Sequence, residues 1–89
     1  ENCYRNALLN CKKIWFIRDE NNYVWRYEIL NENDKNTCNV RVDLLKIKSS
    51  ELDIENFQGK EMNCIVYKVD DVYPEKDIIR CSGILKEKI

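Results

Sequence analysis

The chain has 89 residues, which is enough for one small domain and too few for two. Its 15 Lys and Arg residues and 16 Asp and Glu residues give a net charge of −1, so no strong field of one sign is available to attract nucleic acid or an anionic membrane. There is no His and there are only two Gly residues, which removes the usual general base, the commonest metal ligand and any glycine-rich phosphate loop.

The first segment, Glu1 to Cys11, has the periodicity of a short amphipathic helix. Its apolar residues fall at positions i, i+3, i+4 and i+7, which places them on one helical face: Tyr4, Ala7, Leu8 and Cys11. A helix this short is only marginally stable alone. We therefore expect it to be held by packing, or to continue a longer helix upstream of Glu1.

Four segments are typical of strands in an antiparallel meander. Ile14 to Ile17 is a run of β-branched and aromatic residues, and Tyr23 to Leu30 alternates with a period of two. The polar segment Asn31 to Asn36 is rich in Asn and suits a hairpin connection. A third strand is expected from Cys38 to about Lys48, and a fourth from Glu61 to Val69.

The rest of the chain predicts loops and short helical turns. Ser49 to Lys60 is expected to be a loop that tucks its apolar side chains under the sheet edge. Pro74 suits the first position of a helical turn, after which Ile78 and Cys81 fall on one helical face. The predicted fold is α+β: an N-terminal helix packed on a four-stranded antiparallel meander, with a short C-terminal helical segment, in one disulfide-stabilised domain spanning residues 1–89.

Five cysteines are spread over the chain: Cys3, Cys11, Cys38, Cys64 and Cys81. None of them forms a C-x-x-C pair and there is no His, so the spacing matches no zinc or iron–sulfur site, and we expect no metal and no cofactor. Disulfides are the better interpretation, with buried thiols as the alternative. Because disulfides persist in oxidising compartments, we expect an extracytoplasmic location, either secreted or anchored at the surface.

The expected strand directions narrow the disulfide pairing. Cys64 and Cys81 are the firmer pair, because the chain after the fourth strand has to turn back along it. Cys11 and Cys38 lie near the same end of the sheet, but in its plane they would be roughly 10 Å apart, beyond the usual limit of about 7 Å between Cα atoms, unless Cys11 sits above the sheet. Cys3 is left over as a free or intermolecular thiol, or as a small buried side chain.

Several short segments carry a resemblance to known proteins: Leu9-Asn10-Cys11, Trp25-Arg26-Tyr27-Glu28-Ile29, Cys38-Asn39-Val40-Arg41-Val42, Gly59-Lys60-Glu61-Met62-Asn63-Cys64 and Cys81-Ser82-Gly83. The pattern resembles small exported, mostly archaeal, proteins of unknown function with four cysteines, and it implies location rather than activity. The expected fold is similar to that of cystatins and, in outline, to the heads of type IV pilins. Protease inhibition is not indicated, because only Gln58-Gly59 resembles the Gln-x-Val-x-Gly hairpin of inhibitory cystatins.

Aromatic residues are the candidates for binding. Tyr23, Trp25 and Tyr27 share one face of the second expected strand, with Trp15 on the neighbouring strand. If this row faced water, it could stack sugars or bases. The favoured interpretation is core, because a single helix has to cover a whole face of the sheet and aromatic residues supply the largest buried area.

Acidic residues are the remaining candidates for chemistry. Asp70 and Asp71 with Glu75, or Asp53 with Glu55, could act as acid and base or hold Ca²⁺. Turn chemistry explains these residues better. We therefore assign no catalytic residue and do not expect an enzyme.

Two hypotheses for function remain. The first is a non-catalytic extracytoplasmic binding domain with a protein or glycan partner and no nucleic acid. The second is a structural subunit of an extracellular filament, similar to a pilin head, whose helix continues upstream into an apolar stalk. The sequence has no apolar stretch of 18 residues, so a membrane is expected to be reached only through a segment upstream of Glu1.

Overall fold

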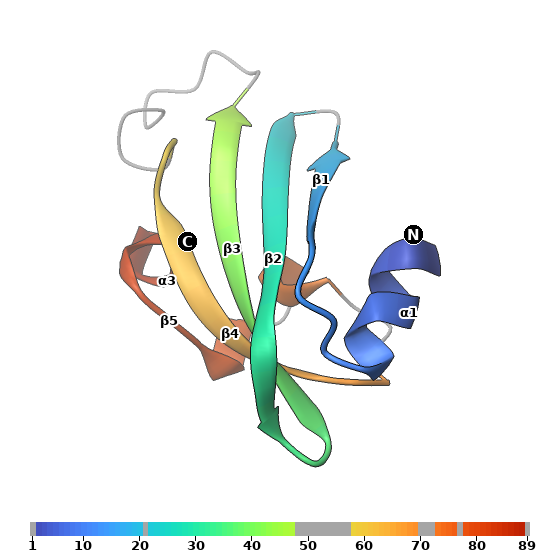
Figure 1. Cartoon of the computed structure of the whole chain (residues 1–89). Helices are drawn as coiled ribbons and strands as arrows, with labels where there is room; N and C mark the ends of the chain where they lie inside the picture. The colour runs from blue at the N-terminus through green and yellow to red at the C-terminus, as the bar shows by residue number, and fades with distance from the viewer. Residues whose placement is uncertain (1, 21, 48–57, 70–72, 77, 89) are drawn as a thin grey trace.

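The computed structural model describes residues 2–20, 22–47, 58–69, 73–76 and 78–88. Its elements follow in chain order: α1 (Asn2–Leu9), β1 (Trp15–Asp19), β2 (Tyr23–Asp34), β3 (Thr37–Ile47), β4 (Glu61–Tyr67), the 3-10 turns η1 (Pro74–Lys76) and η2 (Ile78–Arg80), β5 (Cys81–Ser82) and α3 (Ile84–Lys88). The strands form one antiparallel sheet in the order β1-β2-β3-β4-β5, so each strand pairs with its neighbours in sequence (Figure 1).

The antiparallel sheet expected from the alternating segments is present. In β4 the burial alternates at every residue, as the period-two pattern requires. The second strand is longer than expected, because Asn31–Asp34 pairs with β3 instead of forming the loop. Only Lys35 and Asn36 form the turn, which is held by the Asn36 N–H donating to the Asp34 carboxylate at 2.9 Å.

Cross-strand register divides the sheet into two faces. One row across four strands contains Phe16, Tyr27, Val42 and Met62, which are directly opposite one another and lie on the face that carries the buried residues, called here the core face. The next residue along each strand points the other way. We call that second side the open face; it turns to the viewer in Figure 1, with no helix in front of it.

The predicted architecture, an N-terminal helix packed on a four-stranded sheet, is wrong. A fifth strand is present, since Cys81–Ser82 pairs with β4 opposite Cys64 and Asn63. The sequence had suggested a helical face for Cys81, but η2 ends at Arg80 and Cys81 is extended. The described residues form a mostly antiparallel sheet with two short helices, not the cystatin-like arrangement of one helix across a sheet.

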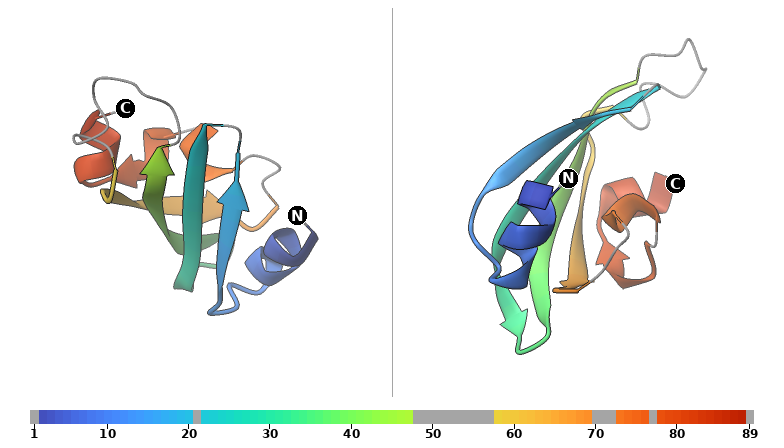
Figure 2. Two further views of the ribbon diagram at one scale, coloured as in Figure 1. Left: turned by 90° about the horizontal axis from the view of Figure 1, so that it is seen from above. Right: turned by 90° about the vertical axis from the view of Figure 1, so that its right-hand side faces the viewer.

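The size of α1 explains this difference. A helix of eight residues is about 12 Å long, whereas five strands spaced about 4.8 Å apart span roughly 19 Å, so α1 is too short to cover the sheet. It lies beside the β1 edge in Figure 1, and it still contributes Tyr4, Ala7 and Leu8 to the core. The C-terminal segment covers the concave side of the curved sheet (Figure 2), where Leu85 of α3 is completely buried.

Both expected disulfides are present. Cys11 follows α1 in a left-handed conformation with φ of 48°, and its Cα lies 5.5 Å from that of Cys38. The loop after the helix therefore lifts Cys11 above the sheet, which resolves the distance conflict noted from the sequence. Cys64 and Cys81 face each other in the β4–β5 register and are bonded. Cys3 lies in α1, but its side chain is outside the described part of the structure.

Pro74 begins η1, as expected from its fixed φ angle. The apolar loop expected over Ser49 to Lys60 lies outside the described residues except for its last three positions, 58–60. Gly83 is the second backbone feature that positions the C-terminal segment, because its φ of 124° is a conformation that L side chains rarely adopt. It joins β5 to α3 at a place where a Cβ atom would lie 3.1 Å from the backbone of β4.

Candidate functional site

The four aromatic residues singled out from the sequence do not form one surface. Trp25 and Tyr27 are buried on the core face, and Tyr23 is half-buried against the same core. Trp15 lies on the open face, because its neighbour Phe16 is the residue opposite Tyr27. The prediction that the aromatic row belongs to the core therefore holds for Trp25 and Tyr27. It does not hold for Trp15, which lies on the opposite face of the sheet.

The open face carries two exposed apolar residues on its edge strand. Trp15 and Ile17 alternate along β1, and 56% and 55% of their surfaces are accessible. The guanidinium of Arg26 lies 5.3 Å from the centre of the Trp15 ring, on the strand next to it. A cation over an indole face is a favourable contact, so it restricts the orientation of an otherwise exposed tryptophan.

A ladder of ion pairs continues from Arg26 across the open face. Arg26 contacts Glu28 at 3.5 Å and Asp43 at 3.2 Å. Arg41 donates to Asp43 at 3.1 Å and pairs with Glu61 at 2.7 Å, and these contacts raise the pKa of Arg41, chiefly through the hydrogen bond to Asp43. The face therefore presents alternating charges in fixed positions beside the apolar edge.

A second polar group lies on the core side and joins β1 to the C-terminal segment. The Glu75 carboxylate accepts hydrogen bonds from the Tyr27 hydroxyl at 2.8 and 2.9 Å and from Arg18 at 2.5 Å. Arg18 also pairs with Glu20 at 2.6 Å and stacks over the Tyr73 ring at 4.1 Å. Only 5% of the Glu75 side chain is exposed.

Burial governs the ionisation of this group. It raises the pKa of Glu75, although the Glu75 amide, Tyr27 and Arg18 all act in the opposite direction. Burial, and then the charge of Glu75, also raises the pKa of Tyr27, so the phenol stays protonated and acts as a donor. With its oxygens engaged by two neighbours, Glu75 is suited to holding η1 against β1 and β2 rather than to chemistry on a substrate.

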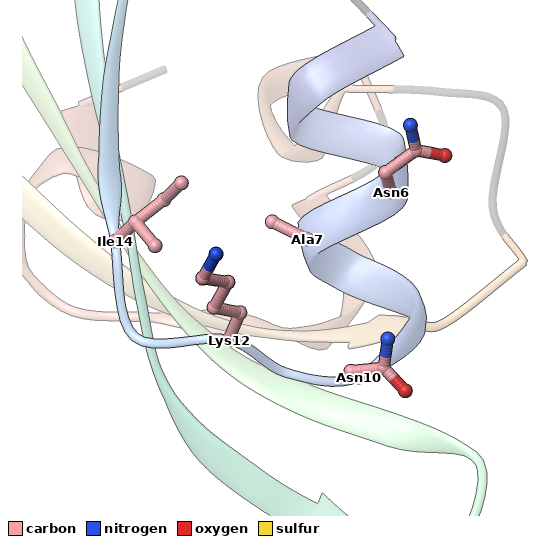
Figure 3. A pocket seen from close by; sticks show the side chains of 5 residues that line it. All are labelled: Asn6, Ala7, Asn10, Lys12 and Ile14. Carbon is pink, nitrogen blue, oxygen red and sulfur yellow. The ribbon is translucent and has the colours of Figure 1, made fainter.

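A shallow pocket lies between α1 and the start of β1. Its volume is about 360 Å³, and it is lined by Asn6, Ala7, Asn10, Lys12 and Ile14. Figure 3 shows Ala7 and Ile14 pointing toward each other across it, with the Lys12 ammonium between them. The pocket thus has a small apolar floor and a polar rim carrying one positive charge.

Sequence reasoning missed the partners of Glu75 because they lie far apart in the chain. Arg18 and Glu75 are separated by 57 positions, and no local pattern links them. Of the acidic residues considered as possible acid–base or calcium groups, Asp53, Glu55, Asp70 and Asp71 lie outside the described residues. No cluster of three potential metal-ligating side chains occurs within the described ranges.

Comparison with protein-family models, with curated proteins and with solved structures finds no match to this chain. In the part of the chain that the structure describes, every helix is too short or too polar to cross a membrane. The filament-subunit hypothesis depends on sequence upstream of Glu1 and stays a prediction.

Proposed function

We propose that this chain is a non-catalytic, extracytoplasmic binding domain that contacts a protein partner through the open face of its sheet. The observation that carries the proposal is the pair of neighbouring exposed apolar side chains on β1, Trp15 and Ile17. Single exposed apolar residues are ordinary, but two on one side of a five-residue edge strand form a local apolar surface.

The composition of the open face favours a protein over a glycan. Tryptophan and arginine are the residue types that most often dominate protein–protein binding energy, and here Trp15 and Arg26 are in contact. The adjacent ladder carries both signs of charge, which suits a partner with complementary charges and fixes its orientation. Of the four aromatic residues singled out from the sequence, only Trp15 is exposed enough for a sugar to stack on it, since Trp25 and Tyr27 are buried and Tyr23 is half-buried.

The two disulfides support the extracytoplasmic location. Bridges of this kind persist in oxidising compartments and are rare in the cytosol. They also compensate for the limited core of a domain this small. A non-catalytic role is supported by the group around Glu75, because its carboxylate is shielded from solvent and engaged by Tyr27 and Arg18.

Site-specific photo-crosslinking in the native host tests the proposal. A benzophenone amino acid is placed at Ile17 in one strain and, as a matched control, at Ile79, an exposed apolar residue of η2. We expect a discrete protein adduct from position 17 that is absent from position 79 and is weakened by Trp15→Ala. The adduct should form outside the cytoplasm, as followed by cell fractionation.

The proposal fails if position 17 gives no adduct, or gives the same adducts as position 79. A carbohydrate adduct, identified by its mass and its sensitivity to glycosidases, would contradict a protein partner. An adduct that forms only in the cytoplasm would contradict the location while leaving the surface in use.

A further inference from the structure

The backbone of β1 bonds β2 along one of its two sides, and its other side forms an edge of the sheet. At one end of the strand pair the Ile29 N–H donates to the Ile14 carbonyl at 2.9 Å, and at the other end the Glu20 N–H donates to the Tyr23 carbonyl at 2.8 Å. In an antiparallel pair, hydrogen-bonded positions alternate with positions whose N–H and C=O groups point away. The even-numbered residues therefore bond β2, and the odd-numbered residues point outward.

Trp15 and Ile17 consequently present their backbone groups at the edge of the sheet. No backbone hydrogen bond between described residues involves the outward groups of these two residues. An open row of N–H and C=O groups is a template for pairing with another extended chain, and proteins usually block it. In β1 no proline or lysine interrupts the row, because the strand reads Trp-Phe-Ile-Arg-Asp.

The helix beside this edge limits what can approach it. In Figure 1, α1 lies alongside the β1 edge, and the pocket of about 360 Å³ occupies the space between α1 and the start of β1. An added strand would lie about 4.8 Å beyond β1 in the plane of the sheet, whereas a second folded copy would bring its own covering layers as well as a strand to the side that α1 already borders. A single extended segment is therefore the occupant that the geometry favours.

The positive charge of Lys12 in the pocket indicates which chemical groups the bound segment carries. Lys12 takes part in none of the ion pairs between described residues. Its ammonium lies between Ala7 and Ile14 in Figure 3. An acidic group at the end of a bound segment would find a cation there that pairs with no described carboxylate, next to the half-buried apolar side chain of Ile14.

We propose that an extended peptide segment of a partner protein adds to the β1 edge as a further strand, with an acidic group beside Lys12 and an apolar side chain against Ile14. This proposal rests on the binding function proposed above and names the form of the partner. Backbone hydrogen bonds to the outward groups of Trp15 and Ile17 supply the contact, and the pocket supplies the preference for sequence.

The test uses phage-displayed dodecapeptides selected against the oxidised 89-residue chain. We expect selected peptides to carry alternating apolar residues and an acidic residue at one end. Hydrogen exchange then reads the mode of binding: saturating peptide should slow exchange of the Trp15 and Ile17 amides by at least about tenfold and leave the already bonded Phe16 and Arg18 amides nearly unchanged.

Two variants at one position separate backbone pairing from side-chain contact. Ile17→Pro removes an outward N–H without removing a bond to β2, and proline is tolerated on an edge strand in this orientation. It should weaken peptide binding at least about tenfold, since a peptide carbonyl loses its donor. Ile17→Thr keeps the N–H and loses only apolar contact, so it should weaken binding by a smaller factor than Ile17→Pro does. Lys12→Glu should weaken acidic peptides by about threefold.

A second experiment modifies the peptide instead of the protein, so its result does not depend on whether Ile17→Pro folds. The selected peptide is methylated on the backbone nitrogens of alternate residues, in two registers. One register should abolish binding to the unchanged protein and the other should have little effect, because only one edge of the added strand faces β1.

The outcomes distinguish this proposal from the function on which it rests. Equal binding by both methylated peptides, or an unchanged Ile17→Pro affinity together with loss on Trp15→Ala, overturns strand addition and leaves the open-face binding function standing. If no peptide is selected but position 17 still gives a specific crosslink, strand addition is likewise overturned and open-face binding stands. Concentration-dependent protection of the Trp15 and Ile17 amides without peptide would identify a second copy as the occupant and would also overturn it.

Discussion

Of the two disulfides, removal of Cys11–Cys38 is expected to lower the free energy of unfolding more, because this bridge closes the longer loop. The bridge spans 27 positions, and the Cys64–Cys81 bridge spans 17 positions in a separate part of the chain. In the chain-entropy model, closing loops of these lengths stabilises the folded state by about 3.5 and about 3 kcal/mol. Because the loops do not overlap, the two contributions should add.

These values are large compared with the stability available to the whole domain. At about 0.05 to 0.15 kcal/mol per residue, a chain of 89 residues has a free energy of unfolding of roughly 4 to 13 kcal/mol. Loss of the longer bridge should therefore lower the melting temperature by about 15 to 25 °C, and loss of both should remove about 6.5 kcal/mol, at least half of the free energy of unfolding available to the domain.

Urea denaturation of the double variant Cys11→Ala with Cys38→Ala checks the first value. Alanine is preferred to serine because Cys38 is completely buried, and a hydroxyl there would add a polar group to the core. Reduced wild-type protein is the control, since it loses both bridges but keeps all the sulfur atoms. If full reduction changes the free energy of unfolding by less than about 1 kcal/mol, the disulfides are not what compensates for the small core.

Three further predictions test the placement of individual residues. Trp25→Ala should destabilise the fold by about 3 kcal/mol or more, whereas Trp15→Ala should change the free energy of unfolding by less than about 1 kcal/mol; equal costs in thermal melts would show that the two faces are assigned wrongly. Gly83→Ala should cost more than Gly59→Ala in urea denaturation, because both have positive φ but only the first would place a Cβ 3.1 Å from backbone atoms. Burial raises the pKa of Glu75, so the folded state binds its proton more tightly than the unfolded state, and stability should fall as pH rises from the ordinary pKa of Glu through the raised value. Glu75→Gln should flatten that part of the stability profile above the ordinary pKa of Glu, and an unchanged profile would exclude this residue as its source.

The strands and bridges were predictable because their signals are local or topological. Period-two alternation identified the segment after Cys38 and the segment after Glu61, and the order of antiparallel strands brought the correct cysteines to the same regions. The fifth strand could not be recognised in this way. Cys81–Ser82 is two residues long, and a period cannot be read from two residues, so its pairing with β4 comes from tertiary contacts alone.

The candidate site was only partly predictable, for a reason that is visible in β1. The first three residues of β1, Trp15, Phe16 and Ile17, are all apolar, so the sequence does not indicate which of them face the core. The register with β2 decides it, since Phe16 lies opposite the buried Tyr27 and its neighbours must point to the other side. Grouping Trp15 with the buried aromatic row was the result of this ambiguity.

The same register links the open face to the free edge. In a strand, the residues whose side chains point to one face are also the residues whose backbone groups point to one edge. Trp15 and Ile17 therefore expose apolar surface together with backbone groups that bond no other described residue. Because 56% and 55% of these residues are exposed, covering the remainder is worth about 1 to 1.5 kcal/mol for each side chain, which becomes available only when a partner is bound. A partner strand on β1 would satisfy the backbone groups and could extend over these side chains, so the two features favour one binding site and not two.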